Sequence, residues 1–269
     1  MTHQHGQAEI LDLDEQVLAE HIASIVGWLP VEASPEQIVD LGSGTGTGTF
    51  ALLNRFPEAR VAAVDSSAEH LHRLRDKAHA AGLDDRVWTV EADLDGAWPD
   101  LGTPELVWAS ASLHHMADPA RTLRQVRELL APGGLLVVVE LAGFPRFLPA
   151  GELADLEERA HKASDRWHAE RMPHRGADWG PMLTSAGFTV TRERTVTVHI
   201  EQSDSDAVGR YALMSLRRLR GSVTLPAEDL ATWDRLLGPE GVALRGDLVV
   251  RTERKVWVAQ PPTDQELSN

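Results

Sequence analysis

The chain has 269 residues, a formal net charge of −15 at pH 7, and 42% hydrophobic and 25% charged residues, which is typical of one globular domain. We expect a single domain over residues 1–269 with no nucleic-acid partner, because the acidic charge would repel a polyanion. The sequence has no cysteine, which excludes disulfides, cysteine nucleophiles and thiolate metal sites.

The N-terminal region, residues 1–35, is predicted to hold an amphipathic helix. Apolar residues recur at mostly three- and four-residue steps from Ile10 to Trp28, and Pro30 and Pro35 end the helix. No part of the chain has an apolar run of the ~20 residues that span a membrane, and the first residues lack the pattern of a secretory signal. We therefore expect a cytoplasmic protein with no membrane partner.

A nucleotide-cofactor loop is predicted where the strand at residues 37–41 runs into four glycines at alternate positions from Gly42 to Gly48. Short apolar runs of this kind form parallel strands that are buried on both faces. Glycine lets a ligand approach backbone that a Cβ atom would block. The helix that opens near Phe50 would also present free N–H groups to the ligand.

The glycine spacing and the preceding acid indicate which cofactor this loop binds. A dinucleotide fingerprint needs a third glycine three residues after Gly44, and that position is Thr47. The Asp40 carboxylate would repel a pyrophosphate, but it would attract an ammonium group and a sulfonium. The segment from Val39 to Gly46 resembles the first motif of the class I S-adenosylmethionine-dependent methyltransferases, a hydrophobic residue followed by (D/E)-x-G-x-G-x-G.

The second predicted strand, residues 60–65, ends in the carboxylate of Asp65. In an open parallel sheet the ligand lies outside the carboxyl ends of the strands, where an acid can accept both hydroxyls of a ribose. Ser66-Ser67 provides an N-cap for a helix at residues 68–80. We expect three histidines of this helix to face solvent rather than a ligand: His70, His72 and His79.

Three further segments resemble the same family. The strand at residues 87–90 leads into Ala92-Asp93-Leu94, where the family places an acid near the adenine amino group. The strand at residues 106–110 precedes residues 112–118, which resemble the family's LHH-x-x-D sequence. A Pro-Gly-Gly turn precedes the strand at residues 135–141, as in the family's L-x-PGG signature.

The resemblance implies a doubly wound α/β fold with seven strands in the order 3-2-1-4-5-7-6 and an antiparallel strand seven. The cofactor-binding core would span residues 36–141, and strands six and seven are expected at residues 188–200 and 248–259. Residues 142–180 and 203–240 are predicted to be helical insertions, with a charged helix at 152–170 and a helical pair over 205–237. We expect them either to form a lid over the substrate or to be helices that pack on the core or at the interface of a homodimer.

The resemblance also implies a reaction and its site. S-adenosyl-L-methionine would donate its methyl group by in-line displacement to an O or N nucleophile of a small molecule, leaving S-adenosyl-L-homocysteine as product. The residues assigned to the cofactor are Asp40, Gly42, Ser43, Gly44, Gly46, Asp65, Ser66, Ala92, Asp93, Leu94 and Ser110.

The candidate catalytic residues are His115, which we prefer, and His114. Both follow strand four near the expected methyl group, and a neutral imidazole can accept a proton from a hydroxyl-type acceptor. Outer candidates from the insertions are His168, His174, Asp178 and Tyr211. No histidines show the spacing of metal ligands, so we expect no metal.

Two alternatives remain open. A protein of this family can keep S-adenosylmethionine without methylating, for example as a regulator or a cyclisation catalyst, because cofactor motifs do not report the acceptor chemistry. An NAD(P)-dependent oxidoreductase is a weaker alternative. It would need the missing glycine spacing and a Tyr-x3-Lys pair, and the only tyrosine, Tyr211, is followed four residues later by Ser215.

Overall fold

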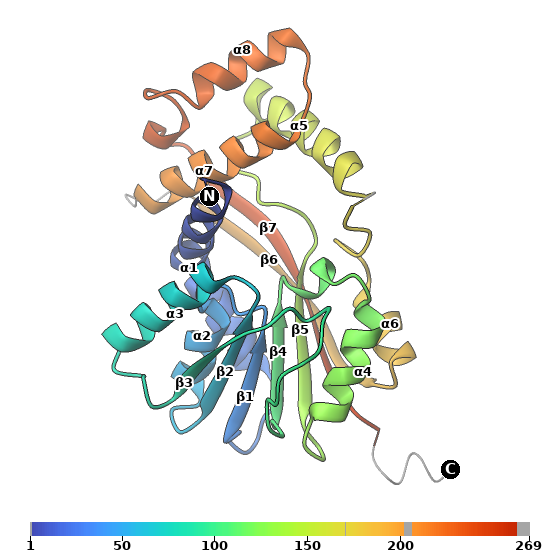
Figure 1. Cartoon of the computed structure of the whole chain (residues 1–269). Helices are drawn as coiled ribbons and strands as arrows, with labels where there is room; N and C mark the ends of the chain where they lie inside the picture. The colour runs from blue at the N-terminus through green and yellow to red at the C-terminus, as the bar shows by residue number, and fades with distance from the viewer. Residues whose placement is uncertain (1, 170, 202–205, 263–269) are drawn as a thin grey trace.

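The computed structural model describes residues 2–169, 171–201 and 206–262, in which one sheet carries all seven strands (Figure 1). The strands are β1 (Gln37–Leu41), β2 (Arg60–Asp65), β3 (Val87–Glu91), β4 (Leu106–Ser110), β5 (Leu135–Leu141), β6 (Thr189–Glu201) and β7 (Val249–Gln260). Their spatial order is β3-β2-β1-β4-β5-β7-β6, as predicted. Strands β1 to β5 pair in parallel, and β7 runs antiparallel to both β5 and β6.

Helices cover both faces of this sheet. They are α1 (Thr2–Trp28), α2 (Thr47–Arg55), α3 (Ala68–Ala80), α4 (Pro119–Leu129), α5 (Glu152–Ala169), α6 (Trp179–Ser185), α7 (Asp206–Ser222) and α8 (Ala227–Leu236). Short 3-10 turns lie at Leu113–His115 and Val242–Leu244. Among the described residues, no helix combines the length and apolar character that crossing a bilayer requires.

Alternating side chains of the central strands pack into two separate hydrophobic cores, one on each face of the sheet. On β1, Val39 and Leu41 join a cluster with α4 and α6, whereas Ile38 joins a cluster with α1 and α2 on the other face. Strand β4 divides in the same way, with Val107 on the first face and Trp108 on the second. Burial on both faces explains why these strands are short apolar runs with few polar residues.

Side-chain caps fix the starts of two helices that follow strands. Ser67 Oγ accepts the backbone N–H of His70 at 3.3 Å, which confirms the predicted cap of α3. Asp118 Oδ1 accepts the N–H of Arg121 at 2.9 Å and begins α4, with Pro119 in its first turn. These caps hold the chain where it turns away from the carboxyl ends of the strands.

Helix α1 begins earlier than the apolar periodicity predicts, at Thr2 rather than Ile10. The added turns pack beside α7, where Arg210 Nη2 donates to Glu9 Oε1 at 2.8 Å. Tertiary contact therefore extends a helix whose first residues have no strong apolar pattern. This packing carries the N-terminal end of the chain over the upper end of the sheet (Figure 1).

The two predicted insertions are helical and gather above the carboxyl ends of the strands (Figure 1). The first contains α5, and residue 170, the predicted end of its helix, lies outside the described residues. The second contains α7 and α8, while residues 202–205 at its start also lie outside them. A third apolar core joins these helices to α1 and the upper part of β7, so the insertions are packed onto the domain.

Candidate active site

The glycine loop after β1 is held tightly against the end of β2. The N–H groups of Gly42 and Ser43 both donate to the Val64 carbonyl, at 2.8 and 2.9 Å. Gly42 has a φ of 70°, and a Cβ atom there would lie 2.4 Å from the Cβ of Ser112. Only glycine fits this position without displacing the start of the segment that follows β4.

A cavity of about 420 Å³ opens between this loop and the ends of β2, β3 and β4. Its walls include the predicted residues Gly42, Gly44, Asp65, Ser66, Ala92, Asp93, Leu94, Ser110 and His115. The predicted residues Asp40, Ser43 and Gly46 do not line it. A wider depression of about 720 Å³ between α1, α2 and α3 contains none of the predicted site residues.

Asp65 is fixed by three donors at the mouth of this cavity. Its carboxylate accepts the N–H groups of Gly44 at 2.9 Å and Ser67 at 2.8 Å, and lies 3.3 Å from His70 Nδ1. Burial raises the pKa of Asp65, but the contacts to His70, Ser67 and Gly44 outweigh it and hold the pKa below its usual value. His70 therefore faces the cavity, and the expectation that it points to solvent is wrong.

Asp40 lies beneath the loop rather than in the cavity. It is buried, and its Oδ2 accepts the hydroxyl of Thr49 at 2.7 Å. Burial raises the pKa of Asp40 to about 7, with the Thr49 bond opposing this rise and the charge of Asp65 adding to it. A Cβ at Gly48 would lie 2.5 Å from Trp108 Nε1 and 3.1 Å from Asp40 Oδ2, so the fourth glycine makes room for the indole and for this carboxyl.

The two adjacent histidines after β4 occupy different environments. His114 is buried, with Nδ1 2.6 Å from Glu140 Oε2 on β5, and its backbone N–H also points to Glu140. His115 is exposed toward the cavity, with its ring centre 4.2 Å from that of His114. The prediction paired these residues but missed Glu140, because a contact across 26 residues leaves no local signal.

The pKa of His115 falls to about 4. Burial of the ring among protein atoms is the main cause of this low pKa. Repulsion from His114 lowers the pKa further, and the attraction of Glu140 opposes the fall. The side of the ring that faces the open cavity is exposed to solvent, while protein atoms surround its other sides. A ligand bound in the cavity would cover the exposed side as well. His115 is therefore neutral at pH 7. From the sequence we expected a pKa near neutral pH, and the pKa of about 4 differs from that expectation.

A second cavity, of about 210 Å³, lies under the insertions and meets the first. Gln7, Leu11, Ala111 and His115 line both. His114, His168 and Tyr211 line the second cavity, while the outer candidates His174 and Asp178 do not, and Asp178 instead caps α6. The structure also brings Arg175, Arg218 and His161 into its wall, which sequence reasoning missed.

Ala111 stands at the junction of the two cavities in an uncommon backbone conformation. Its φ of 51° is the only positive value for a non-glycine residue in the described part of the chain. Its N–H donates to the Val139 carbonyl at 2.8 Å, which holds the turn after β4 in place. Backbone strain of this kind persists where the surrounding structure enforces it, often at functional sites.

The strand order, the glycine loop after β1 and the carboxylate that ends β2 together define the architecture of the class I S-adenosylmethionine-dependent methyltransferases. Residues 39–136 match the family model described as a methyltransferase domain. This match, over less than half of the chain, and the methyltransferases similar to the chain support a class I S-adenosylmethionine-dependent methyltransferase.

Curated relatives match this chain over part of their length. The 27-O-demethylrifamycin SV methyltransferase of Amycolatopsis mediterranei (strain S699) is 34% identical over 134 residues, which cover 49% of this chain and 47% of the relative. The trans-aconitate 2-methyltransferase of Mycobacterium sp. (strain KMS) is 29% identical over 209 residues, 75% of each chain. The chain thus spans about half the length of the first relatives that it matches.

Solved structures of the same fold cover nearly the whole chain. A putative methyltransferase from Bacillus halodurans has a TM-score of 0.56 at 19% identity, covering 90% of this chain and 99% of its own. A methyltransferase from Geobacter sulfurreducens in complex with S-adenosyl-L-homocysteine has a TM-score of 0.52 at 18% identity, covering 90% and 91%. The cyclase SpnF has a TM-score of 0.54 at 20% identity, covering 91% and 82%. These likenesses concern the fold alone.

Proposed function

We propose that this protein transfers a methyl group from S-adenosylmethionine to an O or N nucleophile of a small molecule. The observation that supports this most directly is the pair of adjoining cavities, one beside the glycine loop and one under the insertions. Ala111 and His115 belong to both, so a donor in the first and an acceptor in the second would meet beside these residues.

The residues of the first cavity fit the cofactor. Its volume of about 420 Å³ lies within the usual range for cofactor sites. The Asp65 carboxylate has about four acceptor positions, of which Gly44 and Ser67 use two firmly and His70 a third at 3.3 Å. Ribose hydroxyls could take the free position and replace the long contact with His70. Asp93 is exposed at the end where an adenine amino group would need an acceptor.

The bound cofactor would supply an activated methyl group, and the chain would align the acceptor and exclude water. Helix α1 contributes here, since Gln7 and Leu11 lie over the junction. For a hydroxyl-type acceptor we assign the proton to His114 Nε2. His114 Nδ1–H donates to Glu140, which leaves Nε2 as the acceptor atom and stabilises the charged ring. His115, a weak base, would orient the acceptor.

The first experiment is calorimetric titration with S-adenosylhomocysteine, for which we expect micromolar affinity. Asp65→Ala removes charge-assisted acceptors of ribose hydroxyls, each worth about 1.5–3 kcal/mol, so affinity should fall at least tenfold. The matched control is Glu91→Ala, an exposed acid at the end of the neighbouring strand that does not line the cavity. Equal affinities for all three proteins would refute the assignment of Asp65.

Mass spectrometry of products then separates methyl transfer from a non-methylating role of the same cofactor site. A methyltransferase forms one S-adenosylhomocysteine for each acceptor that gains a methyl group. An acceptor changed without any S-adenosylhomocysteine formed would overturn the proposal and favour a role such as cyclisation.

A further inference from the structure

The second cavity is rich in positive charge although the whole chain is acidic. Arg175, Arg218 and Arg254 line it, and the only acid in its described wall is Asp14. Asp14 is already engaged, since its Oδ1 accepts Arg254 Nη2 at 3.0 Å and the Tyr211 hydroxyl at 2.6 Å. Two guanidinium groups therefore face the cavity without a carboxylate of its wall to neutralise them.

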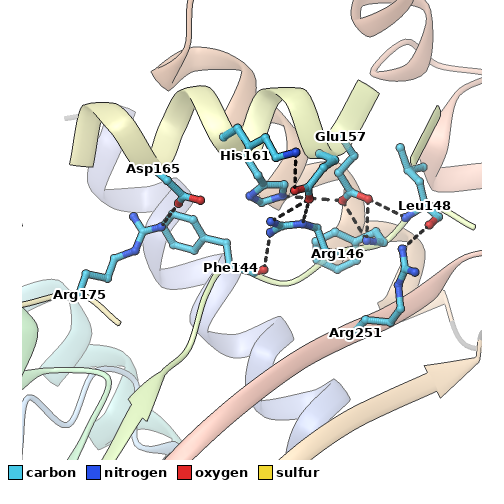
Figure 2. Close-up of polar contacts among 11 residues, drawn as sticks. Phe144, Arg146, Leu148, Glu157, His161, Asp165, Arg175 and Arg251 are labelled. Carbon is cyan, nitrogen blue, oxygen red and sulfur yellow. Dashed lines mark hydrogen bonds and ion pairs between the residues drawn. The ribbon is translucent and has the colours of Figure 1, made fainter. Parts of the chain in front are cut away.

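Arg175 has an unused donor in this cavity. Its side chain is 7% exposed, and Nη2 donates to Asp165 Oδ1 at 2.9 Å, while Asp165 itself is 56% exposed. The guanidinium lies 3.8 Å from the ring centre of Phe144, a stacking that fixes its plane (Figure 2). Nη1 is buried and has no hydrogen-bond partner among the described residues. A buried guanidinium donor of this kind calls for an acceptor.

Arg218, on α7, is a second free cation. It lines the cavity and is exposed by area, and it forms no hydrogen bond or ion pair with any residue in the described ranges. Protein packed around its charged end nevertheless lowers its pKa. The pKa of Arg175 falls mainly through burial, with the charge of Asp165 opposing this fall and repulsion from Arg218 and Arg146 adding to it. Arg175 and Arg218 line the same small cavity, whose described wall holds no acid other than Asp14, and this favours the binding of an anion there.

His161 on α5 lines the same cavity and lies within the influence of its positive charges. Both of its ring nitrogens are buried without a hydrogen-bond partner in the described structure, and the 3.9 Å from Nε2 to Glu157 Oε1 is too long for one (Figure 2). Burial lowers the pKa of His161 to about 3, with repulsion from Arg146 and Arg175 adding to it. The single N–H of the neutral ring can donate a hydrogen bond to an anion in the cavity.

The rest of the wall determines what kind of anion fits. Apolar atoms form most of its surface, and the apolar side chains that line it include Ile10, Leu141, Phe147, Leu216 and Leu219. Hydroxyl side chains, Ser164, Ser215 and Ser222, also line it. The volume of about 210 Å³ corresponds to roughly seven waters at ~30 Å³ each. A small acceptor that is mostly hydrocarbon and carries a carboxylate matches the apolar surface and the cations of this wall.

We propose that the second cavity binds the carboxylate of a small, otherwise apolar acceptor through Arg175 and Arg218. This inference rests on the proposed function, because it names the chemical class of the acceptor for that site. The planar guanidinium of Arg175 can offer Nη1 to one carboxylate oxygen while Asp165 holds Nη2, and Arg218 supplies the second positive group.

The test is a titration with cinnamate, benzoate and hexanoate, each paired with its neutral amide, in the presence and absence of S-adenosylhomocysteine. At least one acid should bind at least tenfold more tightly than its amide. Arg175→Gln and Arg218→Gln should each weaken that binding at least tenfold and leave the affinity for S-adenosylhomocysteine within twofold, since neither lines the first cavity. Compared with Arg175→Gln, Arg175→Lys should recover part of the affinity for the acid, because lysine restores the positive charge but not the planar pair of guanidinium donors.

The matched control is Arg217→Gln, the neighbour of Arg218, which is exposed and donates to the Leu237 carbonyl away from the cavity. It should bind the acids like the unmodified protein. The proposal is overturned if no acid binds, if the amides or inorganic phosphate bind as tightly, or if Arg217→Gln has the same effect as Arg218→Gln. Loss of acid binding alone leaves the proposed function intact, whereas a failure to bind S-adenosylhomocysteine would refute that function itself.

Discussion

His114 and His115 show how two identical neighbours can acquire different chemistry. The carboxylate of Glu140 holds Nδ1 of His114 and would stabilise the charged ring after proton uptake. His115 has no such partner and loses basicity through crowding and the repulsion of His114. A base works best when its pKa lies near the working pH, so a ring with a pKa of about 4 is a poor proton acceptor.

For an acceptor that must lose a proton, we predict that His114→Ala lowers kcat by ~10²–10⁴, while His115→Ala lowers it less. Both should leave the affinity for S-adenosylhomocysteine within a few-fold. Because His115 is already neutral above pH 6, its titration should not shape the rate between pH 6 and 8. Steady-state kinetics across this pH range provide the measurement, and a rate that rises with pH only while His115 is present would contradict the assignment.

Asp40 is a buried acid that lowers the stability of the folded protein by an amount that depends on pH. The unfolded chain releases its proton near the ordinary pKa of 3.8, whereas the folded protein holds it until about pH 7. Between these values the folded state binds more protons, so this group removes stability as the pH rises toward 7. The fold tolerates the cost because the carboxyl accepts Thr49 beneath the glycine loop.

We predict that Asp40→Asn, which keeps an oxygen for Thr49, becomes progressively more stable than the unmodified protein as the pH rises. Between pH 5 and 8 the difference in free energy of unfolding should grow by roughly 1–3 kcal/mol. Urea denaturation at both pH values measures it. Asp76→Asn, at an exposed acid on α3, is the control and should show no comparable trend. A constant difference across the range would mean that Asp40 titrates normally.

At the scale of elements, Glu157 ties α5 to the segment after β5. Its carboxylate accepts the backbone N–H of Phe147 at 2.9 Å and that of Leu148 at 3.0 Å, and it is fully buried (Figure 2). Burial raises its pKa, with these two bonds and the charges of Arg146 and Arg251 opposing the rise. The same turn of α5 presents His161 to the second cavity, so this anchor also positions part of that wall.

We predict that Glu157→Ala lowers the free energy of unfolding by roughly 2–4 kcal/mol, because it leaves two buried N–H groups without an acceptor. Glu158→Ala, at the exposed neighbour that pairs with Arg146 and Lys162, should cost less than about 1 kcal/mol. Chemical denaturation measures both. Similar losses for the two variants would show that the buried contacts with Phe147 and Leu148 contribute little.

The elements that could be predicted are those with a local signature. Strands β1 and β5 are apolar runs, and the turn before α3 has a Ser cap, so their positions follow from the sequence. Gly42, Gly44 and Asp65 likewise line the first cavity, because a parallel sheet gathers strand ends at one edge. The second cavity was not predictable in detail. Arg175 and Arg218 come from separate insertions, and only tertiary packing brings them together.

For the molecule as a whole, the charge of −15 and the cationic second cavity act in opposite directions. The general field repels polyanions, while the local guanidinium groups attract one small anion into a confined space. The absence of a nucleic-acid partner, a cytoplasmic location and a possible homodimer all stay predictions. Filter binding of DNA and RNA and sedimentation of the purified protein would address the first and the last.

Asp14, in the wall of the second cavity, connects three distant parts of the chain. It lies on α1, accepts the Tyr211 hydroxyl from α7 and pairs with Arg254 of β7. Tyr211 is buried, and burial together with the charge of Asp14 raises its pKa well above the usual value, so the phenol remains a donor. Through this contact the insertion holds the part of α1 that bears Gln7 over both cavities.

We predict that Tyr211→Phe lowers the free energy of unfolding by about 1–3 kcal/mol, because a buried bond to a charged acceptor is lost while the ring packing remains. Amide exchange should accelerate in residues 6–14, with no change in β1 to β5, and affinity for S-adenosylhomocysteine should weaken a few-fold as the cover loosens. Arg210→Gln is the control, since its bond to Glu9 joins the same two helices at the exposed surface and should matter little. If Arg210→Gln changed exchange in α1 as much as Tyr211→Phe, the surface pairing rather than the buried Asp14 contact would hold α1 in place.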